Sequence, residues 1–142
     1  MSDGALRAAA QVGSELGIAI VAVTVLTNIS EEECVAIFNV TTEEAIRRLT
    51  RRARNAGLTG VVCSPHEATL VRSLWPEALI ITPGVRSHHV QKLDQVRVAT
   101  PGEAIKNGAD FVVIGRQILS HPSPVKRLAE IQSINAEVAS AL

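Results

Sequence analysis

Four short apolar segments alternate along this chain with helical patterns, and that alternation constrains the fold more than any other feature of the sequence. The segments are rich in β-branched residues and lie at residues 18–26, 60–63, 79–82 and 111–114. Each is continuously apolar, which is typical of strands covered on both faces in a parallel sheet. A regular alternation of helices and strands predicts βα units joined by right-handed crossovers. We therefore expect an α/β protein with a parallel sheet.

The expected helices have clear sequence signals at their ends. Helices are predicted over residues 4–16, 42–56, 65–74, 101–107 and 124–142, and a short helix is expected after Ser30. Thr41 is a further N-cap, and glycines that tolerate a left-handed backbone end the helices at Gly57 and Gly108. Two helix starts combine an N-cap, a proline at the first helical position and a glutamate that closes a capping box: Ser64-Pro65-His66-Glu67 and Thr100-Pro101-Gly102-Glu103.

The length of the chain limits the architectures that it can form. Its 142 residues are 46% hydrophobic and 20% charged, a balance that allows a buried core and excludes wholesale disorder. We expect a single domain over residues 1–142. Parallel βα units build either open doubly wound sheets or eight-stranded barrels, and a complete barrel takes about 250 residues. Four units therefore make half of a barrel if the chain belongs to that class.

Charge balance and composition exclude several classes of partner. Lys+Arg and Asp+Glu both number 14, and the aromatic residues are two Phe and one Trp, so we expect no nucleic-acid partner. The N-terminus lacks the order of a signal peptide, and the apolar runs fall short of the roughly 20 residues that cross a bilayer. Two cysteines suit a reducing compartment. The sequence thus predicts a soluble, cytoplasmic protein with no membrane partner.

Two of the loops that follow the strands carry glycine and arginine. Pro83-Gly84-Val85-Arg86 follows the third segment, and Gly115-Arg116 follows the fourth. The loops after the strands hold the site in βα folds, and glycine lets a ligand approach the backbone closely. A single arginine after a turn is more simply a surface residue. Two arginines at consecutive strand ends instead indicate a site for a phosphate dianion, which barrels commonly bind after their last two strands.

Several motifs occur in an order and spacing typical of one family. They are residues 23–27, 57–64, 81–86, Asp94-Gln95 and residues 108–116. Together they resemble orotidine 5'-phosphate decarboxylase of the bacterial type, from about residue 18 to the C-terminus. The resemblance implies the C-terminal half of a TIM (β/α)8 barrel, with strands five to eight and their helices. It also implies the conversion of orotidine 5'-phosphate to UMP and CO2 in de novo pyrimidine biosynthesis, without a cofactor.

The resemblance assigns ligand-binding roles to five residues. Thr27 resembles the residue that contacts the pyrimidine after the fifth strand, and Arg86 resembles an arginine that helps to bind phosphate after the seventh. Gln95 resembles the glutamine that bridges phosphate and base. Gly115 and Arg116 resemble the main phosphate cradle.

The acid–base residues of that family have no counterpart in this sequence. Their chemistry rests on an Asp-x-Lys-x-x-Asp motif after the third strand, together with an earlier Asp and Lys, and the motif lysine protonates the developing carbanion. This chain has Asp3, Asp94 and Asp110, and none is followed two positions later by lysine. We therefore assign no catalytic residue. We expect the chain to be inactive alone, as a truncated gene product, the product of a misplaced start, or one partner of a split enzyme.

Two other functions stay open on the sequence. The first is a non-catalytic UMP-binding half-barrel, and the second is another phosphate-binding barrel enzyme, such as a sugar-phosphate decarboxylase or isomerase. A metal site at His88-His89 is disfavoured, because adjacent loop side chains rarely point at one ion. Cys63, in a buried strand, is expected to be an inert small hydrophobe, and Ser64 a helix cap.

The expected half-barrel also predicts a protein partner. Four strands leave two sheet edges and an apolar flank exposed, and such surfaces associate. We therefore expect the chain to form a homo-oligomer or to pair with an N-terminal half.

Overall fold

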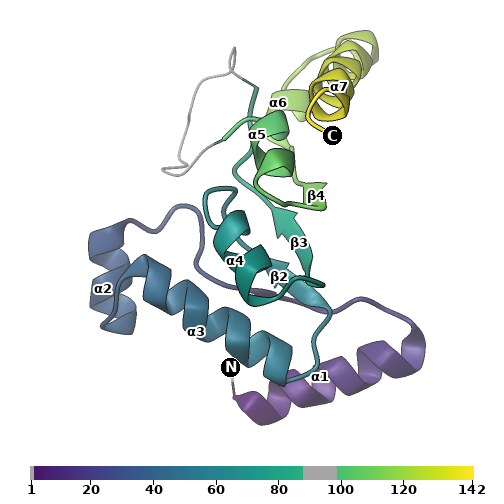
Figure 1. Cartoon of the computed structure of the whole chain (residues 1–142). Helices are drawn as coiled ribbons and strands as arrows, with labels where there is room; N and C mark the ends of the chain where they lie inside the picture. Colours follow the sequence, from purple (N-terminus) through teal and green to yellow (C-terminus); the bar gives the residue numbers. More distant parts are fainter. Residues whose placement is uncertain (1, 88–98) are drawn as a thin grey trace.

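The structure is a computed structural model and describes residues 2–87 and 99–142. Over these residues a parallel sheet has the strand order β1-β2-β3-β4, so each strand pairs with its neighbour in the sequence (Figure 1). The strands are β1 (Val21–Val23), β2 (Gly60–Val62), β3 (Leu79–Thr82) and β4 (Phe111–Val112). The helices are α1 (Asp3–Leu16), α2 (Glu31–Phe38), α3 (Thr42–Asn55), α4 (Ala68–Leu74), α5 (Pro101–Lys106), α6 (Arg116–Leu119) and α7 (Pro124–Ala139).

Each strand lies within an apolar segment that the sequence singled out, but β1 is much shorter than residues 18–26. Gly17 ends α1 in the left-handed conformation, and the Ile18 N–H donates to the carbonyl of Gly13 at 2.8 Å. The first residues of the predicted strand therefore cap α1 instead of pairing with β2.

Most of the predicted helix starts are confirmed, and one is wrong. Ser30 and Thr100 form complete capping boxes, and the Thr41 hydroxyl accepts the Glu44 N–H. Only half of the predicted capping box at Ser64 forms. The Glu67 carboxylate accepts the Ser64 N–H at 2.9 Å, but the Glu67 N–H donates to the Ser64 carbonyl at 3.0 Å rather than to its hydroxyl, so no helix begins at residue 65. Residues 65–67 form a turn, and α4 begins only at Ala68.

One face of the sheet is covered by α3 and α4. Val61 of β2 and Ile80 of β3 are fully buried on this face. They pack in one apolar cluster with Ile46, Ala53 and Val71 of the two helices. This burial is the main apolar contribution to stability that the described elements supply, at about 25 cal/mol per Å² of apolar surface removed from water.

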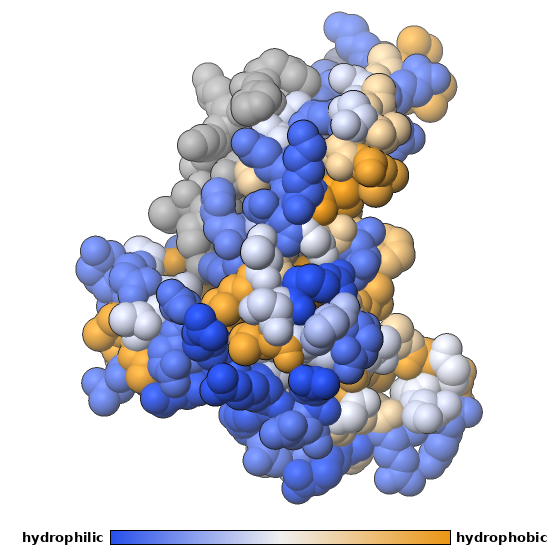
Figure 2. All heavy atoms as spheres, viewed as in Figure 1, coloured by the Kyte–Doolittle hydropathy of each residue, from blue (hydrophilic) through white to orange (hydrophobic). Residues whose placement is uncertain are grey.

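The described residues leave the opposite face open. The strands are therefore not covered on both faces, as their apolar pattern predicted, and this face is instead the exposed apolar flank that was expected of a half-barrel. Val23, Val62, Ile81 and Phe111 pair side by side across the four strands and therefore line one face, which we call the open face. Val23 is 55% exposed and Phe111 is 58% exposed, so the described residues leave both ends of this row uncovered. Figure 2 shows apolar residues at the surface in the region of β4 and α7. The strands are continuously apolar although helices cover only one of their faces.

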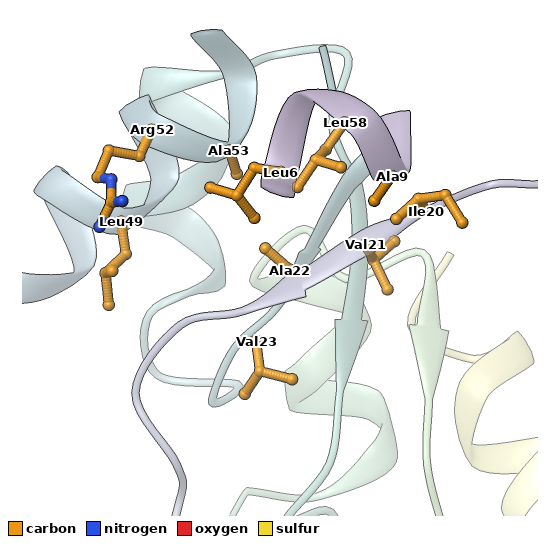
Figure 3. Close-up of a pocket in the computed structure, with 10 residues that line it drawn as sticks. All are labelled: Leu6, Ala9, Ile20, Val21, Ala22, Val23, Leu49, Arg52, Ala53 and Leu58. Carbon is orange, nitrogen blue, oxygen red and sulfur yellow. The ribbon is translucent and has the colours of Figure 1, made fainter. Parts of the chain in front are cut away.

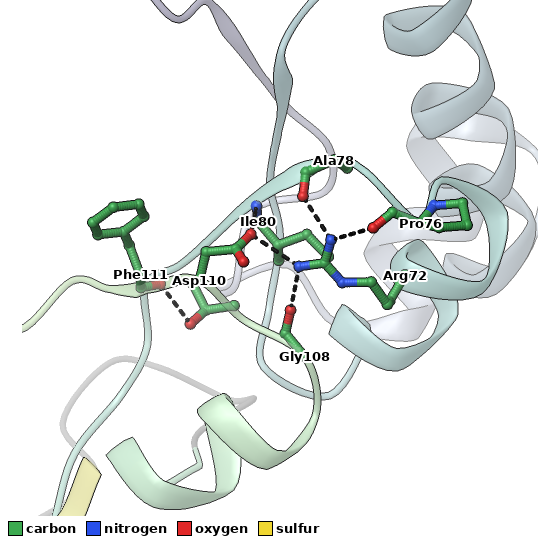
Figure 4. Close-up of polar contacts among 8 residues, drawn as sticks. Arg72, Pro76, Ala78, Ile80, Gly108, Asp110 and Phe111 are labelled. Atoms are coloured by element: carbon green, nitrogen blue, oxygen red, sulfur yellow. Dashed lines mark hydrogen bonds and ion pairs between the residues drawn. The ribbon is translucent and has the colours of Figure 1, made fainter. Parts of the chain in front are cut away.

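Arg72 of α4 ties together the amino-terminal ends of β3 and β4 (Figure 4). Its guanidinium donates to the carbonyls of Pro76 and Ala78 at 2.7 and 2.8 Å, and to the carbonyl of Gly108 at 2.8 Å. It also forms an ion pair of 2.9 Å with Asp110, whose carboxylate accepts the Ile80 N–H at 2.8 Å. One side chain thus satisfies acceptors from the two loops that lead into neighbouring strands.

We predict that Arg72→Ala lowers the free energy of unfolding by about 2–3 kcal/mol, because several acceptors at the sheet end lose a charged donor at once. Arg48→Ala is the matched control. Arg48 pairs with Glu44 one turn away on an exposed helix face, and its removal is expected to cost less than about 0.5 kcal/mol. Urea denaturation measures both changes, and equal losses for the two variants would contradict a special role of Arg72.

None of the described helices combines the length and the apolar character needed to cross a bilayer.

Candidate phosphate-binding site

The loop after β3 is shaped by Pro83 and Gly84. Gly84 has a φ of 77°, in the left-handed region that favours glycine, and it turns the chain away from the strand. Val85 then forms a parallel bridge with Ala99, and the Arg86 N–H donates to the Ala99 carbonyl at 3.0 Å. The backbone that carries Arg86 is therefore fixed immediately before residues 88–98, which lie outside the described residues.

The loop after β4 starts level with the loop after β3. The Val113 N–H donates to the Thr82 carbonyl at 2.9 Å, so the pairing of the two strands continues one residue beyond β4. Gly115 follows and is the N-cap of α6, which begins with Arg116. A Cβ on Gly115 would meet no atom of the described chain within 4 Å. The backbone of Gly115 therefore faces open space at the carboxyl end of the sheet.

The two loops enclose one small cavity of about 220 Å³. Both arginines predicted to bind phosphate line it, and so does Gly115, which brings three of the five predicted ligand-binding residues to one place. The complete lining among the described residues is Pro83, Gly84, Val85, Arg86, Val113, Gly115 and Arg116.

Arg86 lies in an unusual environment for a charged side chain. The residue is only 6% exposed, and its buried Nε has no hydrogen-bond partner among the described residues. A buried N–H of a charged group that lacks an acceptor destabilises a fold, and a bound anion can supply that acceptor. Arg116 lies on the wall of the same cavity and is itself exposed. Two cationic side chains on one cavity make a site that favours an anion able to accept several hydrogen bonds.

The other two predicted ligand residues lie elsewhere. Thr27 is half-buried in the turn after β1, at the same carboxyl edge of the sheet, and it is not among the described residues that line the cavity. Because β2 separates β1 from β3, the strands that lead to Thr27 and to Arg86 are two strand spacings apart, roughly 10 Å. Gln95, with Asp94, His88 and His89, lies outside the described residues.

Comparison with known proteins agrees with this geometry. Residues 1–131 match the model of the orotidine 5'-phosphate decarboxylase / HUMPS family. This chain belongs to that family. A curated relative, the orotidine 5'-phosphate decarboxylase of Shewanella sediminis, is 41% identical over 133 residues, which are 92% of this chain and 56% of the relative. The enzyme of the same name from Anaeromyxobacter sp. is 44% identical over 114 residues, covering 79% of this chain and 50% of the relative. This chain therefore spans about half the length of the curated relatives that it matches.

A solved structure of the same family has a similar fold. The crystal structure of orotidine 5'-phosphate decarboxylase from Lactobacillus acidophilus matches with a TM-score of 0.66 and 28% identity, covering 85% of this chain and 49% of that one. This match confirms the prediction of half of a (β/α)8 barrel and decides against the alternative of an open doubly wound sheet.

The sequence analysis of this decarboxylase-family chain did not single out the two polar residues that directly follow the arginines, Ser87 and Gln117. Ser87 and Gln117 are both buried and hydrogen-bonded to each other, and Gln117 also donates to Glu130 of α7. One signal was present in the sequence: Ser87 directly follows Arg86, and Gln117 directly follows Arg116. A serine and a glutamine after the two arginines do not by themselves predict a hydrogen bond, because the two residues are far apart in the sequence.

A second cavity, of about 390 Å³, lies between α1, β1 and α3 and has a different character (Figure 3). Its walls are mainly apolar side chains, among them Leu6 of α1, Val21 of β1 and Leu49 of α3. Arg52 is charged, but its guanidinium is paired with Asp3 at 2.6 Å. This cavity suits an apolar element and not the phosphate of a nucleotide.

We predict that Arg86→Met keeps or raises the free energy of unfolding in phosphate-free buffer. The substitution retains the apolar stem and removes a buried charge whose Nε has no hydrogen-bond partner among the residues that the structure describes. Thermal unfolding measures the change, and added phosphate should raise the melting temperature of the wild-type chain but not of the variant. A loss of more than about 1 kcal/mol without phosphate would show that Arg86 holds the fold rather than a ligand.

Proposed function

We propose that this chain binds the 5'-phosphate of a pyrimidine nucleotide, orotidine 5'-phosphate or UMP, in the cavity lined by Arg86, Gly115 and Arg116. The observation that carries the proposal is the buried guanidinium of Arg86, whose Nε has no partner among the described residues, on the wall that it shares with Arg116. A phosphate dianion supplies both the missing acceptor and the compensating charge.

The base of the nucleotide lies along the carboxyl edge of the sheet in this proposal. Thr27, in the turn after β1, contacts the pyrimidine, while Gln95 bridges phosphate and base. The separation of roughly 10 Å between β1 and β3 supports a ligand that reaches from one strand end to the other. A free phosphate would use only the arginine end of this site.

The proposed reaction is that of the curated relatives, which are named orotidine 5'-phosphate decarboxylase. The bond from the pyrimidine ring to its carboxylate breaks, CO2 leaves, and a proton takes its place to give UMP. This chain grips the nucleotide, whereas the Asp-x-Lys-x-x-Asp motif that supplies the proton donor is not in its sequence. The isolated chain is therefore proposed to bind nucleotide without turnover, and a polypeptide that carries the motif is proposed to restore activity.

Isothermal titration calorimetry with UMP tests the binding. We expect UMP to bind, and Arg116→Ala to weaken binding by about 1.5–3 kcal/mol, the range for hydrogen bonds to charged groups. Arg48→Ala, on the outer face of α3, is the control and should leave the affinity unchanged. Absence of heat with both UMP and orotidine 5'-phosphate would refute the proposal. Equal affinity for UMP and ribose 5-phosphate would favour a sugar-phosphate enzyme instead.

We also propose that the open face is covered by another four βα units, belonging to a second copy or to an N-terminal half. Three observations support this partner: β1 and β4 are the edges of the described sheet, Val23 and Phe111 are more than half exposed, and the apolar cavity beside β1 lacks an apolar element to fill it. Eight parallel strands close a barrel, so a set of four pairs with another set of four.

Size-exclusion chromatography with light scattering tests this pairing on the chain alone. We expect a dimer or larger species, and Phe111→Asp should shift it towards the monomer by placing a charge on the open face. Val125→Asp, at an exposed position of α7, is the matched control and should not. A stable, well-folded monomer of the wild-type chain would count against the proposal.

A further inference from the structure

The residues that follow the two arginines are hydrogen-bonded to each other. The backbone N–H of Ser87 donates to Oε1 of Gln117 at 3.0 Å, and Nε2 of Gln117 donates to Oγ of Ser87 at 2.9 Å. Both residues are about 5% exposed. Neither is among the described residues that line the cavity. The two bonds join the loop after β3 to the start of α6, next to the residues that line the cavity but not among them.

Two carboxylates of α7, those of Glu130 and Glu137, accept hydrogen bonds from Gln117 and Ser87. Nε2 of Gln117 also donates to Oε1 of Glu130 at 2.5 Å, and Oγ of Ser87 donates to Oε2 of Glu137 at 3.2 Å. The other oxygen of Glu137 accepts the Gly102 N–H of α5 at 3.3 Å. The Glu130 side chain is only 12% exposed, and its second oxygen lies 3.6 Å from Nε2 of His121. The network therefore connects both arginine loops to α7 and α5.

The amide of Gln117 is chemically matched to these neighbours. Its oxygen accepts from a backbone N–H, and its nitrogen donates both to a hydroxyl and to a carboxylate, so the donor and acceptor ends cannot be exchanged without loss. A buried network of this kind specifies one arrangement of the segments that it joins. That arrangement is the one in which Arg86 and Arg116 share a cavity.

We propose that Gln117 is a positioning residue for the phosphate site, which it holds in register through Ser87 on one side and Glu130 on the other. The proposal rests on the proposed function, because it assigns to Gln117 the placement of the two arginines that bind the phosphate. Gln117 itself does not touch the ligand. Its role is to fix the separation of the two loops before the anion arrives, which lowers the cost of ordering the site on binding.

A charge swap tests the proposal. Gln117→Glu keeps the oxygen that accepts the Ser87 N–H, but it turns the other end of the side chain into a carboxylate that faces Glu130. The repulsion should separate the network, and we expect the affinity for UMP to fall by about tenfold or more. Glu130→Gln alone keeps an acceptor for Gln117 and should change the affinity little. The double variant Gln117→Glu with Glu130→Gln restores a donor and an acceptor between the two positions, so we expect its affinity to return to within about threefold of wild type.

Calorimetry with UMP, at a temperature well below each variant's melting temperature, separates positioning from general stability. Arg72→Ala is the control for a loosened fold and should keep the wild-type affinity, since Arg72 lies at the opposite end of the strands. If Gln117→Glu does not fold, Ser87→Ala replaces it, because that variant keeps the backbone bond and removes only the hydroxyl. Its affinity is expected to fall by about threefold.

The outcomes distinguish this inference from the function on which it rests. Failure of the wild-type chain to bind UMP would refute both. If the wild-type chain binds and Gln117→Glu, or Ser87→Ala in its place, binds equally well, the nucleotide site stands and the positioning role of Gln117 is wrong. Weak binding by Gln117→Glu that the second substitution does not restore would also overturn the role. Loss in the single variant and recovery in the double variant is the result that we predict.

Discussion

The parallel pairing of β3 and β4 is the constraint on which the functional end of this molecule depends. Parallel strands deliver their carboxyl ends to one edge, and the bond from Val113 to Thr82 keeps these two strands level as they leave the sheet. Arg86 and Arg116 therefore reach the same cavity although they are 30 residues apart in the sequence, as are Ser87 and Gln117, which directly follow them. The proposed phosphate site needs this convergence, and the described residues of β3, β4 and their following loops provide it.

The arginines at the two ends of the strands differ in how fully their hydrogen-bond donors are satisfied. At the amino-terminal end, Arg72 is saturated with carbonyl acceptors and a carboxylate, so its charge stabilises the fold. At the carboxyl end, Arg86 is buried, and its Nε has no hydrogen-bond partner among the described residues. This N–H can therefore donate to a bound anion. The same residue type thus stabilises the fold at one end and is proposed to bind a ligand at the other. The difference lies in the hydrogen-bond acceptors that the described residues supply to each guanidinium.

Much of this arrangement could be predicted from the sequence, since local signals determine it. Apolar runs marked the strands, and Ser30 and Thr100 marked helix starts through side chains three residues apart. The Ser64 turn was mistaken because the same local pattern also permits a backbone bond from Glu67. The apolar pattern of the strands predicted cover on both faces, because a continuous apolar strand looks alike whether one or two layers cover it. The exposed apolar flank was predicted only from the length of the chain, which supplies four βα units. The pairing of Ser87 with Gln117, and the burial of Arg86, are long-range contacts that no local pattern encodes.

The account depends most on Arg86 and Arg116 acting together on one phosphate, and arginine side-chain NMR tests this directly. In a chain labelled with ¹⁵N at arginine, the Nε–H signals of Arg86 and Arg116 should both shift when UMP is added. The signal of Arg48, whose Nε donates to Glu44 at 2.7 Å on the outer face of α3, should stay in place. A shift of Arg116 with Arg86 unchanged, or no shift of either, would contradict the account.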